Sequence, residues 1–91
     1  MITVHALVIR STLNDFEVAT SALKEVGIPR LKGAPGFVSA QWVRLDETTG
    51  TSMLTFESED AARGGEQMLR ENPPAGLTIN SLEIGKVVAT A

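Results

Sequence analysis

His5 is the residue of this chain best suited to proton transfer. It is the single histidine, and the chain has no cysteine. An imidazole can donate and accept a proton near neutral pH, so a proton-transfer site would use His5 as its acid or base. Glu83, on the expected final strand, is the best candidate for an acidic partner. The alternative is a structural histidine whose ring bonds to a backbone carbonyl or a partner side chain.

Trp42, Met53 and Phe56 are candidates for the apolar wall of a ligand pocket. Trp42 and three phenylalanines are the only aromatic residues, so the same rings are also needed for the core. On a regular strand Trp42 and Phe37 would lie on opposite faces. Arg44, two residues from Trp42, could hold a carboxylate, or it could be an exposed arginine that protects a sheet edge.

The composition argues against several other kinds of site. Without cysteines there is no disulfide framework or thiolate chemistry, and one histidine cannot build a multi-histidine metal site. Eleven acidic against eight basic residues give a net charge of −3, which is unfavourable for binding phosphate backbones or anionic lipid. We therefore expect no cofactor, no metal, no nucleic acid and no membrane among its partners.

The first ten residues, MITVHALVIR, do not have the pattern of a targeting segment. Their charge follows the apolar run, whereas a secretory signal carries it before the run. The run is also too short to cross a bilayer. The expected compartment is the cytoplasm.

Apolar periodicity and turn residues predict the elements that would position these side chains. A helix capped at Asn14 is expected to end at Gly27, and a second helix capped by Ser58 is expected to end before Pro73. A loop is expected at 28–36, a hairpin turn at 46–50, and a bulge or bend at Gly85. The expected strands are 2–9, 37–45, 51–57 and 77–89.

The element order βαββαβ predicts an α+β fold in one domain, residues 1–91. Right-handed crossovers place both helices on one face of a four-stranded antiparallel sheet, which is the ferredoxin-like arrangement. Leu54 and Phe56 are expected to face the helices, with Thr51, Met53 and Thr55 on the other face. Small and flexible residues there, in place of base-stacking aromatics, disfavour RNA binding.

The first strand carries aliphatic residues on both of its faces, so one apolar row would remain uncovered in a monomer. At roughly 25 cal/mol per Å² this is a few kcal/mol of unused burial. We therefore expect a homodimer that pairs its sheets. Gly64 and Gly65, in the second helix, indicate either close packing on the sheet or space left for a ligand.

The whole chain resembles the dimeric α/β-barrel superfamily, and within it the antibiotic-biosynthesis monooxygenase group. The similarity lies in PGFVSAQWVR at 35–44, the turn ending in Gly50, LTFESEDAA at 54–62 and the long final strand. It implies paired ferredoxin-like subunits, each with a ligand cavity between sheet and helices. Phe56 stands where many members have a tryptophan.

The resemblance implies binding of a small hydrophobic or aromatic molecule and cofactor-free monooxygenase-like chemistry, with His5 as acid or base. The second helix lacks the histidine that haem-degrading members use, and a second histidine typical of cyclase-like members is absent. A non-catalytic structural or protein-interaction module is the alternative. Whether the protein is an enzyme stays open at this point.

Overall fold

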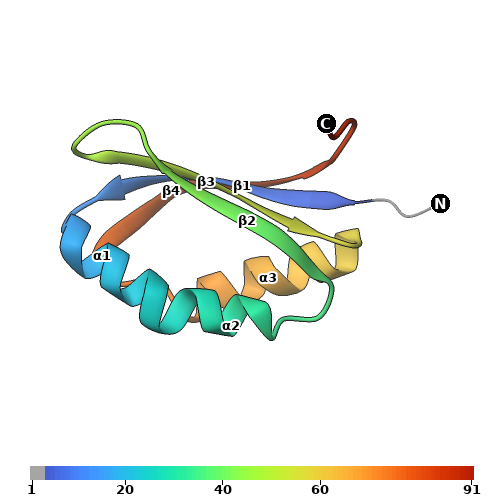
Figure 1. The fold of residues 1–91 in the computed structure, drawn as a ribbon, viewed down its shortest axis with the longest axis horizontal. Helices are drawn as coiled ribbons and strands as arrows, with labels where there is room; N and C mark the ends of the chain where they lie inside the picture. The colour runs from blue at the N-terminus through green and yellow to red at the C-terminus, as the bar shows by residue number, and fades with distance from the viewer. Residues whose placement is uncertain (1–3) are drawn as a thin grey trace.

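A four-stranded antiparallel sheet with its helices on one face makes up the structure, a computed structural model that describes residues 4–91 (Figure 1). The strand order β2-β3-β1-β4 puts β1 and β3 at the centre. This is the predicted ferredoxin-like arrangement, so the predicted fold class is confirmed. The elements are β1 (His5–Leu13), α1 (Phe16–Ala22), the π-helical η1 (Leu23–Gly27), α2 (Ile28–Lys32), β2 (Phe37–Arg44), β3 (Thr49–Phe56), α3 (Glu59–Glu71) and β4 (Leu77–Lys86).

The first helix starts one residue later than predicted and does not stop at Gly27. Asp15, not Asn14, is the N-cap, and its side chain accepts a hydrogen bond from Val18 N. The helical path then runs through η1 into α2, so the predicted loop was wrong for residues 28–32.

The π-helical turn explains how a glycine and a proline fit inside this helix. Ile28 N bonds to Leu23 O, five residues back, which widens the turn. Pro29 then falls in the first turn of α2, where its missing N–H costs little. Gly27 therefore lies within a wide turn and does not end the helix.

Two bulges set the register of the sheet, and neither is at Gly85. In β2 the register shifts between Phe37 and Ser39. In β4 the pairing with β1 skips Asn80, so the predicted irregularity at Gly85 was wrong in position. The final strand ends at Lys86 and not at Ala89. Residues 2 and 3 of the expected first strand lie outside the described part of the chain.

The core lies between the sheet and the helices. Its largest fully buried side chains are Leu7, Leu54 and Phe56, from the two central strands. The Phe56 ring meets Phe37 edge to face, with ring centroids 5.8 Å apart. A Cβ on Gly65 would lie 2.6 Å from Phe56 Cζ, so Gly65 reflects close helix-to-sheet packing.

Candidate functional site

A cavity of about 620 Å³ lies between the sheet and the helices. Its size falls within the range of small-molecule sites. Ile9, Trp42 and Ser52 contribute to the sheet wall, Leu23 and Val26 to the helical wall, and residues 72–75 to one end. The space beneath the helices is therefore not filled by core side chains.

Most of the wall is apolar. Its polar side chains include Thr20, Arg30 and Asn72 on the side of the helices, and Ser11, Arg44 and Ser52 on the sheet. Ser11 and Ser52 are 8% and 9% exposed and are the buried polar residues of the described chain. Ser11 Oγ donates to Gly50 O at the long distance of 3.4 Å. Both serines line the cavity. The Ser11 O–H is used by Gly50 O, so the Ser52 hydroxyl is the donor left for a ligand.

Arg44 lies at the same part of the cavity, at the end of β2. Its guanidinium carbon is 3.9 Å from the centroid of the Phe16 ring, a cation–π contact between β2 and the start of α1. Its Nη2 donates to Glu47 O at 3.2 Å, in the β2–β3 hairpin. Both contacts fix the guanidinium, and Arg44 and Phe16 both line the cavity.

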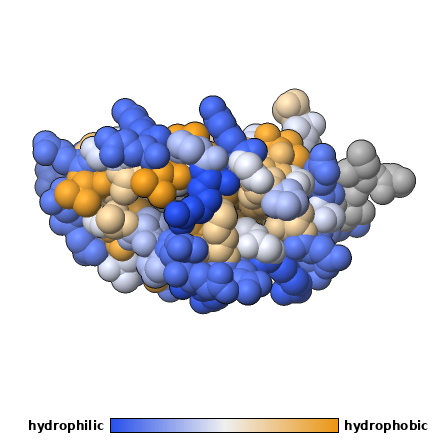
Figure 2. All heavy atoms as spheres, turned by 90° about the horizontal axis from the view of Figure 1, so that it is seen from below, coloured by the Kyte–Doolittle hydropathy of each residue, from blue (hydrophilic) through white to orange (hydrophobic). Residues whose placement is uncertain are grey.

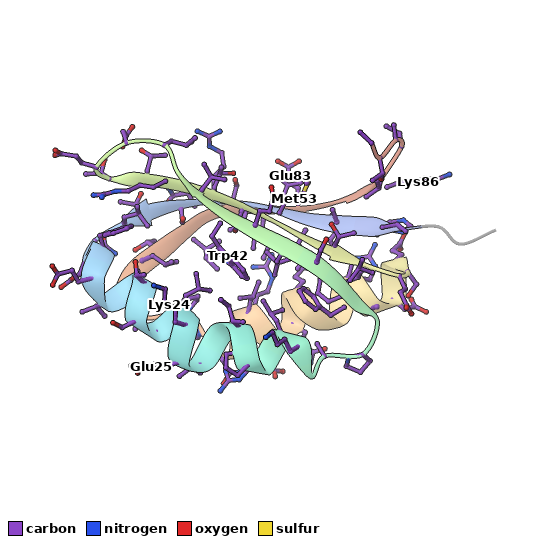
Figure 3. All side chains as sticks on the ribbon, viewed as in Figure 1. Lys24, Glu25, Trp42, Met53, Glu83 and Lys86 are labelled. Carbon is purple, nitrogen blue, oxygen red and sulfur yellow. The ribbon has the colours of Figure 1, made fainter. Side chains whose placement is uncertain are left out.

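Trp42 is the one residue of the predicted site that lines this cavity. Figure 3 shows it below the sheet, on the side of the helices. Phe37 lies on the same face, because the bulge at Val38 shifts the alternation of β2 by one residue. The expectation that Trp42 and Phe37 face opposite ways was therefore wrong.

His5 also faces the helices, but at a different place. It pairs with Phe56 across the strands, and neither residue is among those that line the cavity. Its Nε2 lies 3.6 Å from Glu59 Oε1, in the first turn of α3. The other Glu59 oxygen accepts two hydrogen bonds from Arg63.

Glu83 cannot be the partner of His5, because it lies on the opposite face of the sheet. Glu83 is paired with Val8 on β1. Val8 lies between Leu7 and Ile9, which face the helices, so Val8 and Glu83 point to the other face. Figure 3 shows Glu83 and Met53 together on the side away from the helices. The predicted His5–Glu83 pairing was wrong.

The face away from the helices, here called the open face, carries Met53 as predicted. Val8, Val43 and Met53 are each close to half exposed there, among polar neighbours such as Gln41 and Glu83. On the opposite side, that of the helices, polar side chains cover much of the surface and hydrophobic atoms show between them (Figure 2). The open face is therefore a mixed surface with an apolar centre.

Solved structures of similar fold include two with named activities and one described by its assembly. SnoaB, a cofactor-independent oxygenase from Streptomyces nogalater, is 14% identical over 100% of this chain and 96% of its own, with a TM-score of 0.61. A proposed monooxygenase from Shewanella loihica is 19% identical over 99% and 100%, also at 0.61. A dimeric ferredoxin-like protein from an uncultured marine organism is 12% identical over both whole chains, at 0.68.

This chain has their ferredoxin-like fold. At these identities the likeness concerns the fold, and it agrees with the resemblance found in the sequence. Neither a protein-family model nor a curated protein matches the sequence.

The described residues add two findings about other kinds of site. Within 4–91 no group of three or more His, Cys, Asp or Glu side chains could hold a metal ion. None of the helices formed by these residues has the length and apolar character needed to cross a membrane.

Sequence reasoning missed the two cavity serines. Ser52 is two residues from Leu54 and four from Phe56, so strand alternation already places it on the face assigned to the helices. A serine among buried aliphatic positions was the available signal. Ser11 gave no such signal, because the first strand was expected to end at Ile9 and in fact continues to Leu13.

Proposed function

We propose that this protein binds a small apolar or aromatic molecule in the cavity between its sheet and its helices. The observation that carries the proposal is the unfilled volume of about 620 Å³ beneath the helices. A small domain gains stability by filling such space, since each lost contact costs dispersion energy. Trp42, which lines the cavity, gives it a flat aromatic surface.

Titration calorimetry with naphthalenemethanol, a neutral flat probe, tests this binding. The wild-type protein should bind the probe with one site per chain and shift the indole N–H resonance of Trp42. Ser52→Leu should weaken binding at least tenfold, because the larger side chain enters the cavity. Met53→Leu is the matched control on the same strand but the open face, and it should bind as the wild type does.

Cofactor-independent oxygenation is a second candidate function, and the shared fold with SnoaB favours it. Of the residues that line the cavity, the ionisable ones are Arg30 and Arg44, and an arginine is a poor general base. A proton-abstracting role for His5 would therefore require the substrate to reach the Phe56 end of the sheet. Oxygen uptake with a readily ionised polycyclic phenol, compared between wild type and His5→Gln, tests this reaction.

We also propose that the chain forms a homodimer through the open face. Val8, at 45% exposure, and Met53, at 49%, provide the apolar centre of this face. Burying such side chains contributes about 25 cal/mol per Å² of apolar area. A protein of the same fold is described as dimeric, which supports the same assembly here.

Sedimentation velocity tests the dimer. Wild type should be dimeric at low micromolar concentration, and Val8→Lys should be monomeric because a lysine would be buried against the partner sheet. Val18→Lys is the control, since Val18 is equally exposed at 45% but lies on α1. A wild-type monomer at high micromolar concentration would refute sheet pairing. If the protein were then a non-catalytic interaction module, it would have to bind its partner through a surface other than the open face.

A further inference from the structure

We propose that the cavity selects a carboxylate-bearing aromatic molecule, with the carboxylate held by Arg44 and the neighbouring Ser52. The inference rests on the proposed binding function and adds the chemical class of the ligand. It depends on three features of the described residues: the charge of the cavity wall, the way Arg44 is held, and the place of the serines beside it.

The cavity wall is positively charged although the protein is acidic. The chain carries eleven acidic and eight basic residues, yet no Asp or Glu lines the cavity, whereas Arg30 and Arg44 do. Both arginines are exposed residues at the rim of the cavity, and two positive charges with no carboxylate among the lining residues favour an anion there. A neutral ligand would gain nothing from this distribution of charge.

Arg44 is fixed in position while its charge remains uncompensated. Its two contacts are the Phe16 ring and the carbonyl oxygen of Glu47, and neither supplies a negative charge. No ion pair joins Arg44 to another residue of the described range 4–91. A guanidinium has five N–H donors, and the hydrogen bond to Glu47 O leaves donors that can form a bidentate pair with a carboxylate.

The serines lie on the rows of the sheet nearest to Arg44. One cross-strand row on the helix side of the sheet consists of Arg44, Gly50 and Ser11. The next row on that side contains Trp42 and Ser52. Neighbouring strands are about 4.8 Å apart, and Gly50 places no side chain of its own between Arg44 and Ser11. Ser11 Oγ and Leu13 Cδ2 lie 3.1 and 3.3 Å from the position that a Gly50 Cβ would take. We call Arg44, Gly50, Ser11 and Ser52 the polar notch.

The polar notch suits a carboxylate attached to a flat apolar group. The two oxygens of a carboxylate can accept from one guanidinium edge and from the Ser52 hydroxyl, since the Ser11 O–H already donates to Gly50 O. A Cβ on Gly50 would lie 3.1 Å from Ser11 Oγ, so a larger residue would crowd the hydroxyl. Trp42, one row away, would then contact the ring that carries the carboxylate.

Comparing naphthoate with naphthalenemethanol by titration calorimetry near neutral pH tests the selection. The two probes have nearly the same apolar body and differ in charge. The wild-type protein should bind naphthoate at least about tenfold more tightly, the ratio expected for a charge-assisted hydrogen bond. Added salt should reduce the ratio, since the mouth of the cavity is partly exposed.

Substitutions at two arginines test whether the preference for naphthoate comes from the polar notch. Arg44→Gln should bring the affinity ratio of the two probes close to one. Arg44→Lys should keep part of the preference, because it retains the charge but loses bidentate geometry. Arg70→Gln is the control for net charge and should keep the full ratio, since Arg70 pairs with Glu66 on α3 and does not line the cavity.

The outcomes separate this inference from the proposed function. Equal binding of both probes by wild type would overturn the carboxylate preference and leave the binding function intact. A preference that survives in Arg44→Gln would overturn the role of Arg44. Failure of both probes to bind, with the protein folded by circular dichroism, would overturn the binding function and the inference with it.

Discussion

The contact between Gly65 and Phe56 gives a prediction with a matched control on the next residue. A Cβ at Gly65 would lie 2.6, 3.1 and 3.3 Å from three atoms of the fully buried Phe56 ring. A Cβ at Gly64 would meet nothing within 4 Å. Gly65→Ala therefore forces α3 away from the sheet or displaces the ring, whereas Gly64→Ala does neither.

Both substitutions gain about 1 kcal/mol of helix propensity, so this contribution cancels when the two variants are compared. The remaining difference is the overpacking at Gly65. The shortest contact must lengthen by about 0.8 Å, from 2.6 to the 3.4 Å at which ordinary contact begins. Overpacking of a core on this scale costs about 1–3 kcal/mol. Gly65→Ala should therefore be less stable than Gly64→Ala by about that amount.

Urea unfolding followed by circular dichroism measures this difference, with all variants at one protein concentration because dimerisation shifts apparent stability. In a Phe56→Leu background the difference should shrink, since leucine lacks the three ring atoms that the new Cβ meets. Equal stability of the two alanine variants, or a more stable Gly65→Ala, would show that α3 does not rest closely on the sheet.

Three further predictions concern local contacts. Ser58→Ala should destabilise the fold by about 1 kcal/mol, because Ser58 Oγ caps α3 by accepting from Ala61 N at 3.1 Å, and an unchanged urea midpoint would argue against the cap. Gly36→Ala should also destabilise, since Gly36 has φ 75° and its new Cβ would lie 2.7 Å from that of Ala61; thermal melting no lower than wild type would contradict this. The backbone N–H of Thr48, and after it the side chain of Thr49, hold the pKa of Asp46 below its ordinary value of 3.8. The stability contributed by the ionised carboxylate is therefore present above that value and is lost as pH falls through the lowered pKa. An NMR titration of the Thr48 amide should report this midpoint, and a midpoint at or above the ordinary value would contradict it.

The element order and the side-chain faces of β3 could be predicted from the sequence. Alternation placed Leu54 and Phe56 towards the helices and Met53 on the other face, as found. Period-two alternation fails where a strand holds an extra residue, and nothing in the composition of FVSAQWVR marks Val38 as that residue. That single bulge decided the face of Trp42 relative to Phe37.

The candidate site was harder to predict because it depends on pairing between distant strands. The partner of His5 follows from its face of β1, which the aliphatic residues on both faces of that strand left open, and from the start of α3 beside it. The polar notch needs the register of Arg44, Gly50 and Ser11 across three strands. The two serines and the arginine are not spaced along the chain in a pattern that would predict such a site.

The π-helical segment η1 has a consequence for how the chain tolerates changes in length. A turn of this kind holds one residue more than an α-helical turn, so deletion of one residue within 23–27 would restore ordinary winding. Because the wide turn absorbs the extra residue, the residues after it, including the buried Leu31, would keep their present direction in the shortened helix. This wall of the cavity should therefore tolerate the loss of one residue within 23–27 better than the same loss elsewhere in the helix, where each residue advances the side chains by about 100°.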